Sequence, residues 1–184
     1  MFIQTEQTPN PATLKFLPGC TVMTSGTANF PDRGSAARSP LAERLFQLPE
    51  VNGVFLGSDF ITVTKTGDSD WQRLKPAVLA AIMEHFTTGR PVVIGEAQTA
   101  SAAAPAEEDN EVVAQIKELL ETRVRPAVAM DGGDITFEDY EDGIVYLHMQ
   151  GSCSGCPSST ATLKAGIENM LRHYIPEVVE VRAI

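Results

Sequence analysis

The sequence has little of what marks membrane, secreted or nucleic-acid-binding proteins. Its 184 residues include three cysteines and one tryptophan, and no apolar run approaches the length of a membrane span. An odd number of cysteines does not make a disulfide framework. Basic residues number 14 against 24 acidic ones, so the formal net charge is -10. This charge argues against a nucleic-acid binder and, more weakly, against docking on anionic membranes.

Signatures of nucleotide-driven and hydrolytic enzymes are also missing. The sequence contains no G-x-x-x-x-G-K-[ST] loop, no G-x-S-x-G elbow and no H-E-x-x-H helix. The first residues, Met1 to Glu6, lack the basic flank and apolar stretch of a secretory signal, and they are not an Arg-rich transit peptide. The sequence therefore predicts a cytoplasmic protein, or a mature organellar protein whose presequence is missing.

Composition divides the chain into two parts. Residues 97–108 are small and polar and contain no large apolar side chain, so they can bury little surface, and we expect a flexible linker there. We therefore predict an N-terminal domain over 1–96 and a C-terminal domain over 109–184. Both are small mixed domains, which places the protein in the α/β class, of the α+β type.

The N-terminal part alternates between strand and helix patterns. A strand is expected at 13–17, a loop at 24–38, a hairpin from 51–56 and 60–65, and helices at 39–48 and 70–86. Ser39-Pro40 is a favourable helix start, because a capping hydroxyl precedes Pro at the first helical position. Pro76 is expected to bend the second helix.

The C-terminal part has a clearer pattern, α-β-β-α-β. Asp109 or Asn110 can cap a helix that carries Val113, Ile116, Leu120, Val124 and Val128 on one stripe and kinks at Pro126. Two strands, 135–140 and 144–149, flank the hairpin turn Asp142-Gly143. A helix then begins at Pro157, and a last strand is expected at 178–181.

The most informative feature is the pair Cys153 and Cys156, two residues apart in a loop rich in Gly and Ser. Because Pro157 fits a first helical position, Cys156 stands at or beside the helix N-terminus, where the dipole lowers thiol pKa and favours anionic centres. Ser152 and Ser154 can donate hydrogen bonds to sulfur. We therefore expect thiolate chemistry at this loop.

Three kinds of site remain open for such a pair: a redox dithiol, a zinc site and an iron–sulfur site. The last two need further ligands. His148 and His173 lack the spacing of zinc ligands, and Cys20 is a lone thiol across the linker. Two chains related by a two-fold axis would instead bring four thiolates together, in a site that can open.

Sulfur and aromatic side chains elsewhere have simpler interpretations. Trp71 is expected in the core, because it begins a stripe of apolar residues at helical spacing. Met130, Met149 and Met170 are expected in or near the core rather than as ligands. Asp131 and Asp134 are better explained by a Gly-rich turn than by a site for a hard metal ion.

Several sequence stretches resemble the Nfu family. The C-terminal part is similar to the family's NifU-like domain, and the N-terminal part to its Nfu N-terminal domain. The stretches that carry this resemblance are Arg125-Pro126, Asp131-Gly132-Gly133-Asp134, Gly151 to Ser159, Thr162-Leu163-Lys164 and Gln4 to Phe16. Together they cover nearly the whole chain except the linker.

The resemblance implies a non-catalytic iron–sulfur cluster scaffold or carrier. It implies a [4Fe–4S] cluster bridged between two subunits by Cys153 and Cys156 of each, received from upstream assembly proteins and passed to apo-proteins. The N-terminal domain would help to recognise partners. The resemblance is to the two-domain form of mitochondria and related bacteria, and because no presequence is seen we expect a bacterial cytoplasm, with the mitochondrial matrix as the alternative. A thiol–disulfide oxidoreductase using the same pair and a zinc-stabilised interaction module are the alternatives.

Overall fold

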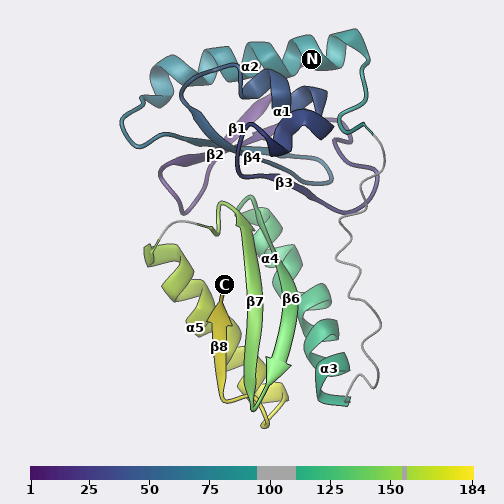
Figure 1. The fold of residues 1–184 in the computed structure, drawn as a ribbon, viewed down its shortest axis with the longest axis vertical. Helices are drawn as coiled ribbons and strands as arrows, with labels where there is room; N and C mark the ends of the chain where they lie inside the picture. Colours follow the sequence, from purple (N-terminus) through teal and green to yellow (C-terminus); the bar gives the residue numbers. More distant parts are fainter. Residues whose placement is uncertain (95–110, 155–156) are drawn as a thin grey trace. The chain divides into compact units, whose positions relative to one another are not determined.

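Two compact units, Met1–Ala100 and Ser101–Ile184, make up the computed structural model of the chain. The structure describes residues 1–94, 111–154 and 157–184 (Figure 1). The predicted linker, 97–108, lies outside these residues, as do Cys156 and the two candidate helix caps at 109 and 110.

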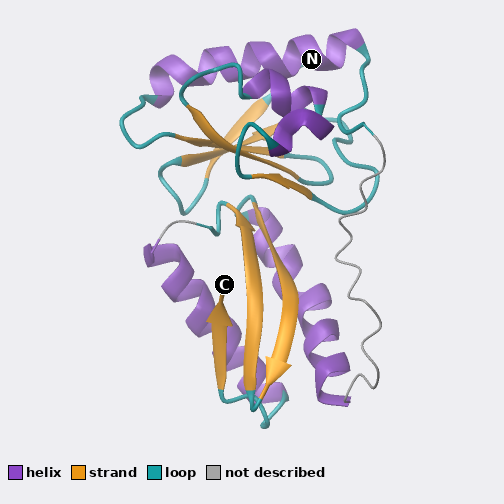
Figure 2. Cartoon of the chain, viewed as in Figure 1, coloured by secondary structure: helices purple, strands orange, loops and turns teal. Residues whose placement is uncertain are grey.

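Unit 1 contains a five-stranded sheet and three helical segments. The strands are β1 (Gln4–Gln7), β2 (Thr13–Leu17), β3 (Ala28–Phe30), β4 (Val51–Leu56) and β5 (Ile61–Lys65), in the antiparallel order β1-β2-β5-β4-β3. The helical segments are η1 (Ser35–Arg38), α1 (Pro40–Leu45) and α2 (Trp71–Thr88). Helices α1 and α2 lie together on one side of the sheet (Figure 2).

The core of unit 1 forms between that side of the sheet and the two helices. Leu41 and Leu45 of α1, and Val78 of α2, pack in one cluster with residues of β2, β4 and β5. The predicted cap is confirmed, since the Ser39 hydroxyl accepts from the Ala42 N–H at 3.1 Å. The Asp70 carboxylate caps α2 in the same way, by accepting from the Gln72 N–H. Capping satisfies N–H groups that a helix start leaves without a partner.

The sequence-based boundaries hold for β2 and the β4–β5 hairpin, but two strands were not predicted. The expected loop at 24–38 contains β3 and the short helix η1. Strand β1 is polar and largely exposed, so it has no apolar alternation that would identify it.

Unit 2 has the predicted order α-β-β-α-β. It consists of α3 (Glu111–Leu119), the π-helical turn η2 (Leu120–Val124), α4 (Arg125–Met130), β6 (Gly133–Glu141), β7 (Ile144–Gly151), α5 (Pro157–Tyr174) and β8 (Glu180–Ala183). Strand β7 is central, antiparallel to β6 and parallel to β8. Figure 1 shows α3–α4 and α5 flanking these strands.

The core of unit 2 lies on one face of its sheet. Val145, Leu147 and Met149 alternate along β7 and are buried together with Ile116 of α3 and Leu171 of α5. The predicted turn is confirmed, since Asp142 and Gly143 have φ of 50° and 81°, as a tight hairpin turn requires. Among the described residues, no helix combines the length and apolarity needed to cross a membrane.

The predicted kink at Pro126 takes the form of a π turn. The Arg125 N–H bonds to the Leu120 carbonyl, five residues earlier, and Pro126 follows directly. Proline has no N–H and its ring collides with the carbonyl four residues before it. A wider turn at this point accommodates the ring, so the helix continues with Val124 and Val128 both buried.

Candidate functional site

The described part of the cysteine loop is held against the turn between α4 and β6. The Ser152 N–H donates to the Gly132 carbonyl at 3.3 Å, and the Ser152 hydroxyl donates to the Asp131 carbonyl. Ser152 is 1% exposed, so these bonds are shielded from water and strongly favoured. The loop that carries Cys153 is therefore fixed to the turn 131–132.

The Cys153 thiol lies directly against Gly133. A Cβ built on Gly133 would lie 2.6 Å from Cys153 Sγ, 2.7 Å from the Gln150 carbonyl oxygen and 3.2 Å from the Cys153 nitrogen. All three distances are below an ordinary van der Waals contact. Position 133 must therefore lack a side chain for the thiol to lie where it does.

Cys153 is buried, and its environment favours the protonated thiol. The residue is 5% exposed and belongs to the apolar core of unit 2. The pKa of the Cys153 thiol is raised to about 11, chiefly by burial; a hydrogen bond with Ser152 lowers it, and the carboxylates of Asp131 and Asp134 raise it. The expectation that the helix N-terminus lowers thiol pKa is therefore wrong for Cys153.

Hydroxyl groups near Cys153 make short hydrogen bonds to the backbone. The Ser154 hydroxyl donates to the Gly151 carbonyl at 3.0 Å, and the Thr160 hydroxyl donates to the Cys153 carbonyl at 3.0 Å. Ser152 Oγ lies 4.0 Å from Cys153 Sγ and makes its shorter bond to Asp131. These hydroxyls shape the loop and tie it to the first turns of α5.

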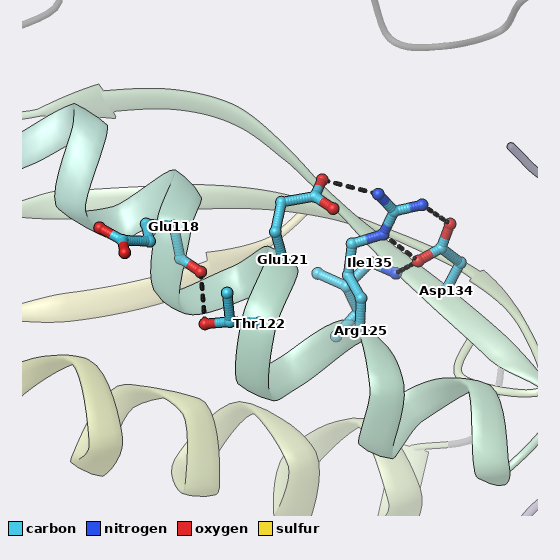
Figure 3. A network of polar contacts seen from close by, with 6 residues as sticks. All are labelled: Glu118, Glu121, Thr122, Arg125, Asp134 and Ile135. Atoms are coloured by element: carbon cyan, nitrogen blue, oxygen red, sulfur yellow. Dashed lines mark hydrogen bonds and ion pairs between the residues drawn. The ribbon is translucent and has the colours of Figure 1, made fainter.

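A charged network supports the same turn from the other side (Figure 3). Arg125 donates from Nε to Asp134 Oδ1 at 2.8 Å and from Nη2 to Oδ2 at 2.9 Å, and from Nη1 to Glu121 at 2.6 Å. Asp134 Oδ1 also accepts from the Ile135 N–H at 2.8 Å. The hydrogen bonds to Asp134 raise the pKa of Arg125, so the guanidinium stays charged.

This network gives Asp134 a structural role, although the turn is shorter than the predicted 131–134 and consists of 131 and 132 alone. The carboxylate is 3% exposed, and a buried charge of this kind needs a bidentate cation nearby. Gly132, with φ of 82°, supplies the left-handed position of the turn. Gly133 and Asp134 then begin β6, so Arg125 anchors the strand on which the Cys153 thiol lies.

Cys20, His148 and His173, which the sequence disfavours as ligands, form no metal-binding group in the described residues. Cys156 lies outside them. Cys20 is half-buried and belongs to unit 1. His173 stacks edge-on against Tyr174, with ring centroids 5.1 Å apart, and His148 lies on the half-buried face of β7. Within the described ranges, no group of three or more His, Cys, Asp or Glu side chains could hold a metal ion.

The predictions for Met and Trp are confirmed in part. Met149 is buried, and Met170 packs against the core of unit 2. Met130 is 76% exposed, which contradicts its predicted position in or near the core; it is the last residue of α4. Trp71 packs against the core of unit 1 but is half-buried.

Two family profiles match the sequence, one in each unit. The profile described as "Scaffold protein Nfu/NifU N terminal" matches residues 3–89, and the profile described as "NifU-like domain" matches residues 116–182. The chain belongs to the Nfu family. The N-terminal profile describes scaffold proteins, in agreement with the expectation of an Nfu protein that is not an enzyme.

Curated relatives of this Nfu chain are similar along its whole length. The human "NFU1 iron-sulfur cluster scaffold homolog, mitochondrial" is 55% identical over 185 residues, which cover 100% of this chain and 72% of the relative. "NifU-like protein 4, mitochondrial" of Arabidopsis thaliana is 55% identical over 181 residues, 97% of this chain and 64% of the relative. Both relatives are named as mitochondrial proteins, so they lend no support to the expected bacterial cytoplasm.

Among solved structures, a NifU-like protein from Saccharomyces cerevisiae aligns with 52% of this Nfu chain and 87% of its own, with 27% sequence identity and a TM-score of 0.43. A TM-score of that size does not establish a common fold.

Proposed function

We propose that the chain is an iron–sulfur cluster carrier that binds a [4Fe–4S] cluster between two subunits through Cys153 and Cys156. The cluster is its cargo, received from assembly proteins and passed to apo-proteins. Full-length similarity to a protein named as an iron–sulfur cluster scaffold homolog supports this proposal. The donor chemistry fits as well, because thiolates are the usual ligands of such clusters.

The observation that carries the proposal is the cysteine loop itself. One chain offers two thiols two residues apart, whereas a [4Fe–4S] cluster takes four. The described residues contain no metal-binding cluster that would complete the set. A second copy related by a two-fold axis provides the missing thiolates at an interface that can separate, and separation would release the cargo.

Burial of Cys153 counts against the alternative of a thiol–disulfide oxidoreductase. Such enzymes need an accessible thiolate with a lowered pKa, whereas Cys153 is 5% exposed and its pKa is raised to about 11. Cluster binding tolerates that state, since iron displaces the thiol proton on binding. The Cys153 side chain must then leave the core position beside Gly133 when iron binds.

Anaerobic reconstitution of the full chain with iron and sulfide tests the proposal. We expect about two iron and two sulfide per chain, a visible absorbance of [4Fe–4S] type, and dimers by sedimentation that appear with the cluster. The double variant Cys153→Ala, Cys156→Ala should take up no cluster, and the matched variant Cys20→Ala should load as the wild type. Equal uptake by the double variant would refute the proposal, and zinc without iron in the protein as isolated would favour the zinc module.

Transfer is tested separately from binding. The loaded protein is mixed with an apo-protein that needs a [4Fe–4S] cluster, in the presence of a chelator that captures free iron. We expect activation of the apo-protein and return of the carrier to monomers. Activation that the chelator abolishes would show release into solution rather than transfer.

A further inference from the structure

A groove of about 500 Å³ opens in unit 1, between the start of α2 and the β1–β2 hairpin. Its walls include Trp71 and Lys75 of α2, Pro9 and Pro11 of the hairpin turn, and Thr5 and Gln7 of β1. The volume lies within the range of pockets that hold a ligand or the side chains of a peptide. All of its lining residues belong to unit 1, so the groove is separate from the cysteine loop.

The register of the sheet explains why the groove is open. Thr5 pairs with Phe16, and Gln7 pairs with Leu14, so their side chains share the face that α2 covers. Trp71 lies over Phe16, with ring centroids 6.4 Å apart. Strand β1 lies next to β2 at the edge of the sheet, and its polar side chains form the floor of the groove beside Trp71.

Hydrogen bonds fix the walls in place. Trp71 Nε1–H donates to the Pro11 carbonyl at 3.1 Å. The Thr8 hydroxyl donates to the Thr13 carbonyl at 3.0 Å, and Asn10 Oδ1 accepts from the Ala12 N–H at 3.0 Å. A groove whose walls are already ordered loses less entropy on binding.

The charge of the groove is positive, in contrast to the chain as a whole. Lys75 is the one charged side chain among the lining residues, whereas the chain carries a net charge of -10. Nearby carboxylates are engaged elsewhere. Glu6 pairs with Lys15 at 3.5 Å on the opposite face, and Asp70 caps α2 through the Gln72 N–H at 2.9 Å. This groove therefore favours an acidic ligand more than most of the protein surface does.

An open strand edge runs along the same groove. Among the residues that the structure describes, β1 pairs with β2 alone, so alternate residues of β1 direct their backbone N–H and C=O groups outward. We propose that this groove binds an extended segment of a partner protein, which adds to β1 as a further strand. An apolar side chain of the segment packs on Trp71, and a carboxylate two residues away pairs with Lys75. This proposal goes beyond cluster binding and does not depend on it.

Trp71 makes the test direct, because it is the only tryptophan of the chain. The probe is a blocked peptide, Ser-Val-Thr-Phe-Thr-Glu-Thr-Val, added to the full chain while tryptophan emission is recorded. Two control peptides carry backbone N-methyl groups, one on the odd-numbered residues and the other on the even-numbered residues. A third control peptide has lysine in place of glutamate. The protein variants are Lys75→Glu and, as a control of equal charge change on an exposed loop, Arg33→Glu.

We expect a saturable change in tryptophan emission, weakened about tenfold by Lys75→Glu and little changed by Arg33→Glu. One N-methylated peptide should fail and the other should bind, because one set of amides faces β1 and the other faces away. The lysine peptide should bind more weakly to the wild type. No saturable change, equal weakening by both variants, or equal binding of both N-methylated peptides would overturn the proposal. Binding that persists in Cys153→Ala would show its independence from cluster binding.

Discussion

Replacing Gly133 with alanine tests the contact between β6 and the cysteine loop. Gly133 has no positive φ, so alanine fits the backbone and the effect is steric. The new Cβ would lie 2.6 Å from Cys153 Sγ and 2.7 Å from the Gln150 carbonyl oxygen, and ordinary contacts are about 3.5–4.0 Å. The thiol and the facing strand must each move by about 1 Å.

The size of the effect follows from the stiffness of these neighbours. Gln150 is paired in register with Asp134 across β6 and β7, so the carbonyl does not move freely. Overpacking of this kind costs about 1–3 kcal/mol. We therefore expect Gly133→Ala to lower the free energy of unfolding of unit 2 by that amount.

Urea unfolding followed by circular dichroism measures the loss, and tryptophan emission reports on unit 1 as an internal reference. Gly166→Ala on α5 is the matched control, because a Cβ there meets nothing within 4 Å. That change should stabilise the helix by about 0.5–1 kcal/mol. If Gly133→Ala proves as stable as Gly166→Ala, the contact between Gly133 and the Cys153 thiol is wrong.

Three further predictions concern buried polar groups. Arg125→Leu should destabilise unit 2 by about 3 kcal/mol in urea unfolding, because Asp134 stays buried without its bidentate partner, and Arg125→Lys should cost about half as much. Unit 1 should lose stability as the pH falls below 6.5, because burial lowers the pKa of His85 in the folded state and the unfolded chain therefore takes up the proton first. Urea unfolding at several pH values measures this loss, and the free energy of unfolding should depend less on pH in His85→Gln. Iodoacetamide should modify half-buried Cys20 faster than buried Cys153 in the apo-protein, as peptide mass spectrometry measures; equal rates would contradict the burial of Cys153.

Elements with strong periodicity or turn chemistry could be predicted from the sequence. The turn at Asp142-Gly143 and the start of α5 at Pro157 could be predicted because these residue types strongly favour a hairpin turn and a first helical position. Strand β1 could not be recognised, because most of its side chains are exposed and polar, so its sequence shows no apolar alternation. Its existence depends on pairing with β2, which local sequence does not encode.

The candidate site shows the same division. The cysteine pair was evident as a motif, and so were the two glycines before Asp134. Their separate roles were not: Gly132 adopts the left-handed conformation, whereas Gly133 makes room for Cys153 Sγ. That second role depends on a contact across twenty residues. The same is true of the raised thiol pKa, because its largest cause is burial, which depends on residues distant in the sequence.

The π turn η2 makes this helix intolerant of losing one residue. Removing one exposed residue from it, such as Thr122, would restore regular α-helical spacing. The helix would keep the same face toward the core on both sides of the deletion, because a π turn carries one residue more than an α turn over about the same rotation. The ring of Pro126 would then collide with the carbonyl four residues before it, so deletions in η2 should be rejected during evolution, whereas substitutions at exposed positions of α3 and η2 should be accepted.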